Sequence, residues 1–267
     1  MWKPCAALLP ASAGERRKAV TLPPALYHAH HGAFAADLPF WEALAARAGG
    51  PVLALGCGTG RVALPLAAAG FPTVGVDWDA AMLAFLQRRA AAGGGSLPLG
   101  LVQADFRALP FGAAAFPLVV LPCNTYTTMP PRERAAFLRG VARVLRPGGF
   151  FAFSAPNPAL VAALPPQAEA EPEAAFRHPE SGLPVQVSSG WRREGTRWTV
   201  RWHYDTLHPD GTVERVTVSQ THWLAPVEAE RGLLKAAGLH VVAEYGDFDH
   251  APLAPDAPYW VVVAQRL

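Results

Sequence analysis

The stretch VLALGCGTGRVALPLAAAG, residues 52–70, decides the fold of this chain. Its first four residues are apolar and predict a short buried strand. Glycines follow at positions 56, 58 and 60, and an Ala/Leu-rich segment typical of a helix then runs to a glycine at position 70. A strand, a glycine turn and a helix in this order can hold a ligand against bare backbone, because the first N–H groups of a helix are unpaired and favour negative charge.

The composition is that of a globular protein. Of the 267 residues, 51% are hydrophobic and 16% are charged, and the net charge of +2 is too small to indicate binding to nucleic acid or to an anionic membrane. No apolar run approaches the ~20 residues that span a bilayer. The three cysteines share no short paired spacing, which argues against a disulfide framework or a zinc site and favours the cytoplasm.

Strand-like and helix-like segments alternate as far as residue 156. Strands are expected at 52–55, 71–77, 99–105, 116–122 and 150–156, and helices at 60–69, 80–94 and 131–145. This alternation predicts a parallel sheet with helices on both faces and with ligands at the carboxyl ends of its strands. One or two further helices are expected within 21–50. Asp37 is the expected cap of the second, and its buried face is expected to carry Phe40, Trp41 and Leu44.

The pattern changes after residue 156. Residues 157–182 are rich in Pro, Ala and Glu and indicate a loop or a short helix. Residues 183–223 alternate with a period of two around turns at Gly195 and Asp210-Gly211, which predicts an antiparallel three-stranded β-meander. One face of the meander is expected to carry Trp198, Val200, Trp202 and Tyr204. A helix at 227–238 and a final pair of strands complete the chain.

Two classes of ligand suit the glycine turn. Dinucleotide-binding enzymes use G-x-G-x-x-G, but Arg61 stands where the third glycine of that motif would fall, which disfavours a nicotinamide-dependent oxidoreductase. The chain instead resembles the class I S-adenosylmethionine-dependent methyltransferases of the small-molecule type. The resemblance rests on LGCGTGR followed by VGVD, on QADFRALPF at 103–111, on RVLRPGGFFAFS at 143–154 and on the closing pair from EYGDFD to VVVAQ.

The resemblance implies an α/β fold, which is a doubly wound, Rossmann-like, seven-stranded sheet with an antiparallel last strand pair. It covers residues 25–267 apart from the meander, with 1–24 as an N-terminal tail. The meander, residues 183–223, is read as an insertion, and we expect it to cover the acceptor side, because the connection between the fifth strand and the last helix leaves the carboxyl edge of the sheet. The resemblance also implies a binding site for S-adenosylmethionine. In that site Gly56, Cys57 and Gly58 would lie against the methionine part of the cofactor, and Asp77 would accept hydrogen bonds from both ribose hydroxyls. Trp78 and Met82 would pack on the adenine, whose polar edge would bind Asp105 and the N–H of Phe106. Leu121 to Asn124 would line the opening of the site beside the methyl group that is transferred.

Two positions depart from the family's pattern. Ala54 stands where the first motif usually carries an acid that supports the amino group of the cofactor, and Pro117 replaces an aspartate of the fourth strand. The first change weakens the expected grip on the methionine part and leaves the nucleoside grip of Asp77 and Asp105 intact. Asp77 could alternatively cap the following helix, and Asp105 could serve only as a turn residue.

The expected function is methyl transfer to a small-molecule acceptor. A non-catalytic protein that binds the cofactor stays open as an alternative, as does the oxidoreductase. The catalytic residues are not assigned, although His222, Tyr204 and Tyr27 are candidates for a general base. A homodimer through the Trp/Tyr face of the meander competes with a role at the acceptor.

Two residue clusters have simpler explanations than a binding site. Alternation sends Trp198 and Trp202 to one face and Arg197 and Arg201 to the other, which is ordinary for a half-buried sheet and does not require RNA. The histidines at positions 28, 30 and 31 have no partnering cysteine or acid at metal-ligand spacing, so we expect a solvated or lid segment there.

Overall fold

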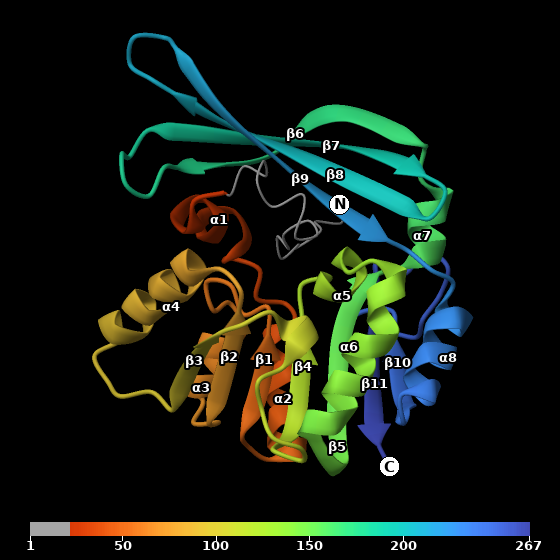
Figure 1. Cartoon of the computed structure of the whole chain (residues 1–267). Helices are drawn as coiled ribbons and strands as arrows, with labels where there is room; N and C mark the ends of the chain where they lie inside the picture. Colours follow the sequence, from red (N-terminus) through yellow and green to blue (C-terminus); the bar gives the residue numbers. More distant parts are fainter. Residues whose placement is uncertain (1–21) are drawn as a thin grey trace.

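Two β-sheets organise the computed structural model, which describes residues 22–267 (Figure 1). The larger sheet has the strand order β10-β11-β5-β4-β1-β2-β3. Its strands are β1 (Val52–Leu55), β2 (Thr73–Asp77), β3 (Leu99–Gln103), β4 (Phe116–Leu121), β5 (Leu145–Pro156), β10 (Leu239–Tyr245) and β11 (Tyr259–Arg266). The first five are parallel, and β11 runs antiparallel to both of its neighbours. The predicted seven-stranded sheet with an antiparallel last pair is confirmed.

Helices cover both faces of the larger sheet because its strands are apolar on both sides. Leu53 and Leu55 of β1 pack with residues of α6 and α8, whereas Val52 and Ala54 pack with residues of α2 and α3 on the opposite face. The chain forms two helices before the glycine turn, within the expectation of one or two. The helices are α1 (Pro24–His31), α2 (Leu38–Ala48), α3 (Ala63–Ala68), α4 (Ala80–Ala92), α5 (Thr125–Thr128), α6 (Pro131–Val144), α7 (Pro158–Ala163), α8 (Val227–Ala236) and the 3₁₀ turn η1 (Phe106–Ala108).

The second sheet lies across the end of the first at which α1 and α5 are found (Figure 1). It has four antiparallel strands in the order β6-β7-β8-β9, so the prediction of three was wrong. The strands are β6 (Gln167–Arg177), β7 (Pro184–Glu194), β8 (Arg197–Leu207) and β9 (Val213–Trp223). The added strand, β6, is an edge strand with register shifts and a proline, and most of it is exposed. An exposed edge tolerates proline and glutamate, so β6 lacks the alternating hydrophobic pattern that reveals β7 to β9.

The inner face of the second sheet is a hydrophobic layer of its own. Trp198, Val200, Trp202 and Tyr204 of β8 are buried together on this face, as alternation predicts. They belong to one cluster with Leu26 of α1 and with residues of α4 and α7. Because this face is already covered within the chain, it is not available as the homodimer contact that the sequence left open.

A buried ion pair ties α6, α8 and β9 together. The guanidinium of Arg134 pairs with the carboxylate of Glu230 and donates to the carbonyl oxygen of Trp223. Glu230 also accepts from the hydroxyl of Tyr126 at 2.5 Å. Arg134 and Glu230 are both buried, so each charge depends on the other for its stabilisation.

A second buried ion pair replaces the helix cap expected at Asp37. The carboxylate of Asp37 makes no capping hydrogen bond to α2. It accepts instead from Arg61 at 2.5 and 2.7 Å and from the indole N–H of Trp41 at 2.8 Å. The buried arginine of the glycine-turn segment needs an opposite charge more than the helix needs a cap. Phe40, Trp41 and Leu44 do form the buried face of α2, as predicted.

The Arg134–Glu230 pair yields a stability prediction. Glu230→Gln leaves the Arg134 charge buried without its carboxylate, and we expect a loss of about 3 kcal/mol in the free energy of unfolding, or roughly 6–12 °C in Tm. Asp205→Asn is the matched control, because Asp205 pairs with Arg215, whose side chain is 56% exposed. That change should cost at most about 1 kcal/mol. Thermal unfolding of both variants measures the difference, and equal losses would contradict the prediction.

Candidate functional site

The glycine turn after β1 forms a cradle of bare backbone. Gly56, Gly58 and Gly60 have φ values of +57°, +52° and +82°, a region that disfavours residues with a Cβ atom. A Cβ atom on Gly56 would lie 3.3 Å from the Cγ2 atom of Thr125. A Cβ atom on Gly60 would lie 2.1 Å from Leu86 of α4, so this glycine allows α4 to approach the turn. The turn therefore combines open backbone with close packing from two neighbouring elements.

The carboxylate of Asp77 joins the end of β2 to the glycine turn. One of its oxygens accepts from the N–H of Gly58 at 2.8 Å, and the other accepts from the N–H of Asp79 at 2.9 Å. Each oxygen has a second lone pair, which leaves capacity for two more donors. The side-chain cap of α4 is Asp79, not Asp77, so the alternative that Asp77 is merely this cap is wrong. Burial raises the pKa of Asp77 to about 6, although its backbone hydrogen bonds lower it.

Asp105 is engaged in its own turn. Its carboxylate accepts from the backbone N–H of Arg107 at 3.0 Å and caps η1. It also pairs with the guanidinium of Arg107, which reaches Glu133 of α6 at 2.6 Å. The turn role considered from the sequence is therefore present. The adenine role of Asp105 and of the neighbouring Phe106 N–H stays a prediction.

The other residues expected at the cofactor lie in different surroundings. Cys57 packs against Gly75 of β2, where an added Cβ atom would lie 2.9 Å from the sulfur. Burial raises the pKa of the Cys57 thiol well above its usual range, which argues against a nucleophilic thiolate at this position. Trp78 is half-buried, Met82 belongs to the hydrophobic layer under the second sheet, and Leu121 is fully buried in the core of the larger sheet. Their contacts with a cofactor stay predictions.

A small cavity lies beside Ala54, the position at which the family's pattern usually has an acid. Ala54, Gly56, Cys57 and Tyr27 are among the residues that line it, and its volume is about 20 Å³. Arg61 also lines this cavity, with its charge balanced by Asp37. The side chain of Ala54 is thus surrounded by glycine-turn backbone, an aromatic ring and an arginine already paired with an acid.

Helix α1 lies between the glycine turn and the second sheet (Figure 1). The Nδ1 atom of His28 lies 3.2 Å from the hydroxyl of Thr59 in the turn. The Nδ1 atom of His30 lies 2.8 Å from the Tyr204 hydroxyl, and its Nε2 atom lies 2.8 Å from a carboxylate oxygen of Glu173. These histidines are at least partly buried, so the segment is not simply solvated, and its role as a lid stays a prediction. Within residues 22–267, no group of three or more His, Cys, Asp or Glu side chains could hold a metal ion.

The chain segment after β4 brings unpartnered polar groups together. Cys123 and Asn124 have φ values of +63° and +58°, and Asn124 is buried. Among the described residues, neither the nitrogen nor the oxygen of its side-chain amide has a hydrogen-bond partner. Thr127, one turn later in α5, links this segment to His222 of β9, since its hydroxyl lies 2.9 Å from the Asn124 carbonyl oxygen and 2.9 Å from the His222 Nδ1 atom.

Of the three candidate bases, His222 alone combines full burial with an unpartnered ring nitrogen, its Nε2 atom. The hydroxyl of Tyr204 already contacts the Nδ1 atom of His30, and burial raises the pKa of this phenol. Tyr27 lies beside Gly58, where an added Cβ atom would meet its ring at 3.8 Å. Sequence analysis did not identify Thr127, because no local pattern marks a residue whose partner is 95 positions away.

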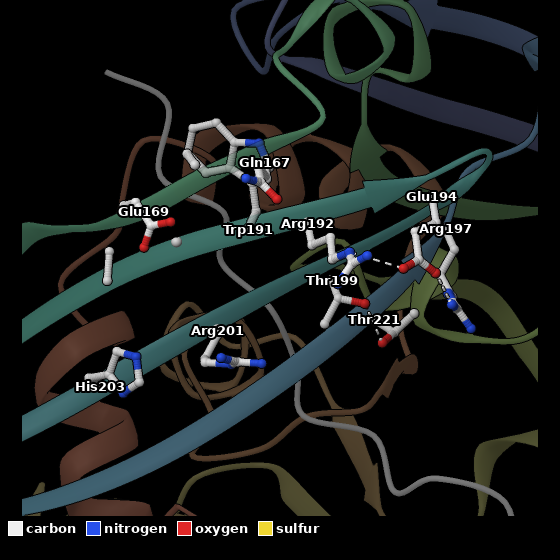
Figure 2. Close-up of a pocket in the computed structure, with 13 residues that line it drawn as sticks. Gln167, Glu169, Trp191, Arg192, Glu194, Arg197, Thr199, Arg201, His203 and Thr221 are labelled. Carbon is white, nitrogen blue, oxygen red and sulfur yellow. Dashed lines mark hydrogen bonds and ion pairs between the residues drawn. The ribbon is translucent and has the colours of Figure 1, made fainter.

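A larger hollow lies on the other side of the second sheet. Figure 2 shows this pocket of about 420 Å³, in which Glu194 pairs with Arg192 and Arg197 beside the contacting hydroxyls of Thr199 and Thr221. Its residues occupy the face of β8 opposite to the buried tryptophans. The pocket therefore faces away from the glycine turn. Arg197 and Arg201 line this pocket, whereas Trp198 and Trp202 are buried on the inner face, so the separation expected for these four residues is confirmed.

No helix of the described chain has the length and apolarity that crossing a membrane requires.

Comparisons with known proteins identify the domain that contains the glycine turn. Residues 52–149 match the model of a methyltransferase domain. A curated relative, the cypemycin N-terminal methyltransferase of a Streptomyces species, is 37% identical over 112 residues, which are 42% of this chain and 44% of that protein. The chain thus matches less than half the length of this relative. The expected resemblance to the S-adenosylmethionine-dependent methyltransferases is confirmed.

Solved structures extend the likeness to nearly the whole fold. The sugar N-methyltransferase KedS8 from Streptoalloteichus has a TM-score of 0.71 at 23% identity and covers 92% of this chain and 94% of its own. CalS10 from Micromonospora echinaspora, an amino pentose methyltransferase solved with S-adenosylmethionine bound, has a TM-score of 0.70 at 19% identity and covers 94% and 100%. At these identities the likeness establishes the fold.

The contact of α1 with the second sheet yields a prediction about the lid. Burial raises the pKa of Glu173, but hydrogen bonds from His30, Ser189 and Trp202 outweigh it and lower the pKa overall. The carboxylate therefore stabilises the folded lid above about pH 4.5, and this contribution is lost as the pH falls through the lowered pKa. We expect Glu173→Gln to speed amide exchange in residues 24–31 at pH 7.

Hydrogen-exchange mass spectrometry measures this effect. The measured quantity is the free energy of local opening of residues 24–31, taken relative to the free energy of global unfolding at the same pH. In the wild type it should fall between pH 7 and pH 3.5, whereas in Glu173→Gln it should change little across that range. Glu169→Gln on the outer face is the matched control and should behave as the wild type. Equal protection of α1 in the wild type and Glu173→Gln at pH 7 would contradict the assignment.

Proposed function

We propose that this chain, whose residues 52–149 form a methyltransferase domain, transfers a methyl group from S-adenosylmethionine to a small-molecule acceptor. The observation that carries the proposal is the Asp77 carboxylate hydrogen-bonded to the N–H of Gly58 at 2.8 Å. This contact joins the acid at the end of β2 to the glycine turn, the two elements that would hold the two ends of one extended ligand.

The residues present fit this cofactor. The cradle at Gly56 and Gly58 offers backbone with no Cβ atom in the way, and Asp77 keeps two lone pairs for a pair of hydroxyl donors. The bound cofactor would supply a methyl group that is already reactive, because the sulfonium to which it is attached is a good leaving group. The protein then needs mainly to align the acceptor and to exclude water. A site covered by α1 and the second sheet suits both tasks.

The acceptor proposed here is a small molecule that carries a nitrogen nucleophile. Relatives of this chain include an N-terminal methyltransferase, a sugar N-methyltransferase and an amino pentose methyltransferase. A cytoplasmic location and a homodimer stay predictions. The nicotinamide-dependent oxidoreductase is disfavoured by Arg61, which is buried and paired with Asp37 where that class has a glycine.

Ligand-induced stabilisation tests the proposal. A thermal-shift comparison of S-adenosylhomocysteine, NAD and NADP should show stabilisation by the first alone, since a ligand at 100 times its Kd adds about 2.7 kcal/mol. Transfer of a labelled methyl group to an acceptor then separates an enzyme from a protein that only binds the cofactor. Stabilisation by NAD instead would contradict the proposal.

Asp77 gives the sharpest test of the nucleoside site. Asp77→Ala should weaken S-adenosylhomocysteine binding by roughly 10- to 150-fold, because two charge-assisted hydrogen bonds are lost. Asp77→Asn should be nearly as damaging, since one acceptor oxygen becomes a donor. Trp78→Phe is the control for the same nucleoside and should have a mild effect, because an aromatic ring is kept. Isothermal titration calorimetry on variants with a wild-type circular dichroism spectrum measures these affinities, and wild-type affinity in Asp77→Asn would remove the assignment.

The same carboxylate predicts a pH dependence of binding. Hydroxyl donors favour the ionised form of Asp77, whose pKa is about 6 in the free protein. Affinity for S-adenosylhomocysteine should therefore fall as the pH decreases through about 6 and level off above it. Asp77→Asn cannot titrate at this position and should lose the dependence. A wild-type affinity that does not change between pH 5 and 8 would contradict this role for the charge.

A further inference from the structure

His222, Thr127 and Asn124 form a buried polar group that the methyltransferase motifs do not include. Thr127 joins the other two residues, because its hydroxyl oxygen lies 2.9 Å from both the Asn124 carbonyl oxygen and the His222 Nδ1 atom. A hydroxyl has one proton to donate, and a carbonyl oxygen can only accept. If the proton goes to the Asn124 carbonyl, the His222 Nδ1 atom must carry its own proton and donate it to Thr127.

This assignment of donors leaves a lone pair on the Nε2 atom of His222. The atom is buried and, within the described part of the chain, has no hydrogen-bond partner. The opposite tautomer would bury an unpaired N–H group and would place two oxygen lone pairs against each other at the Asn124 carbonyl. Buried N–H groups without a partner are rarer than under-used acceptors. The geometry therefore favours a neutral ring with Nδ1 protonated.

We propose that the Nε2 atom of His222 accepts an N–H hydrogen bond from the methyl acceptor, an amine that enters as the neutral free base, and that Thr127 positions the ring by fixing its tautomer. The proposal rests on the proposed function. Asn124 adds a second observation, because its buried side-chain amide is unpartnered and its carbonyl shares the same hydroxyl. The side-chain amide of Asn124 and the Nε2 atom of His222 both lack partners among the described residues, and both residues contact the Thr127 hydroxyl. Such a pair indicates a ligand with polar hydrogens.

The charges around His222 decide between an amine and an alcohol. Burial, with the charge of Arg134 on α6 in addition, lowers the pKa of His222 to about 3. Arg134 pairs with Glu230 of α8, which also accepts from Tyr126, and neither Thr127 nor Trp198 beside the ring is charged at neutral pH. A ring that resists protonation cannot remove the proton of an alcohol. It can still orient an amine, whose lone pair is nucleophilic without deprotonation.

The reaction then balances without a protein base. The amine nitrogen forms a bond to the methyl carbon while the carbon–sulfur bond breaks and its electron pair stays on sulfur. The products are S-adenosylhomocysteine and a methylated ammonium ion, which passes its extra proton to water on leaving the site. His222 and Asn124 act before this step, by holding the acceptor with its lone pair free.

Nuclear magnetic resonance tests the tautomer without turnover. The full chain is labelled with ¹⁵N-histidine, and long-range ¹H–¹⁵N correlations are recorded, with the His222 signals assigned by their loss in His222→Gln. We expect the Nδ1–H tautomer from about pH 5 to 8, retained in Thr127→Ser and lost in Thr127→Val. An Nε2–H tautomer or an imidazolium in the wild type would overturn the proposal.

Methyl transfer tests the acceptor class with matched probes. The pairs are 2-amino-2-deoxy-D-glucose against D-glucose, and glycylglycinamide against its N-terminal hydroxy analogue, with the product located by mass spectrometry. We expect methylation on nitrogen only, and methylation on oxygen would overturn the proposal. If no probe reacts, the tautomer measurement still decides it. Failure to bind S-adenosylhomocysteine, by contrast, would remove the proposed function and leave the tautomer result standing.

Variants of His222 separate a contact with the acceptor from a packing role. For an amine probe that reacts, His222→Asn should raise KM about 10-fold and leave S-adenosylhomocysteine affinity within about twofold. His222→Gln should recover most of the loss, because its amide oxygen reaches the position of Nε2. The pH–rate profile should show a rising limb from the amine and none from His222. Equal effects of both variants on cofactor affinity and KM would assign the residue to packing and overturn the proposal.

Discussion

The contact between the Asp77 carboxylate and the N–H of Gly58 is the constraint that organises the candidate site. It forces a turn with three positive φ angles to close against the end of the neighbouring strand. The acid is buried to make this contact, and burial raises its pKa to about 6. Hydrogen bonds from the hydroxyl groups of a ligand would replace some of the hydrogen bonds to water that this carboxylate loses on folding. The glycine turn and the poorly solvated acid are thus two parts of one proposed binding surface.

The second sheet changes what this binding surface can do. It adds no charged group directly at the glycine turn, and its inner face is dominated by buried aromatic and aliphatic side chains. The buried charges near the junction of the two sheets are paired, as Arg134 is with Glu230 and Arg61 with Asp37. Two neutral groups have no hydrogen-bond partner among the described residues, namely the side-chain amide of Asn124 after β4 and the Nε2 atom of His222 on β9. A site of this kind orients a neutral acceptor more readily than it removes a proton.

The sequence predicts those features that local spacing determines. The glycine turn, the acid at the end of β2 and the alternation along β8 are set by neighbours within a few residues, and the structure confirms their positions. Asp37 shows the limit, because a helix cap is a local rule and the buried charge of Arg61, 24 positions away, overrides it. Strand β6 was missed for a related reason, since an exposed edge carries no hydrophobic pattern. The tautomer of His222 depends on Thr127, and only the folded chain brings the two together.

The absent acid of β1 can be understood from its surroundings. Ala54 lies in an apolar cluster with Val52, Val62 and Leu118, and Arg61, which lines the same small cavity, already has a carboxylate from Asp37. An acid at position 54 would be desolvated among aliphatic side chains and would compete with Asp37 for the same guanidinium. The buried acid of this region is therefore Asp37, the residue just before α2, and not a residue of β1. Under the proposed function, recognition of the cofactor would depend more heavily on the nucleoside end, where Asp77 keeps lone pairs for further donors.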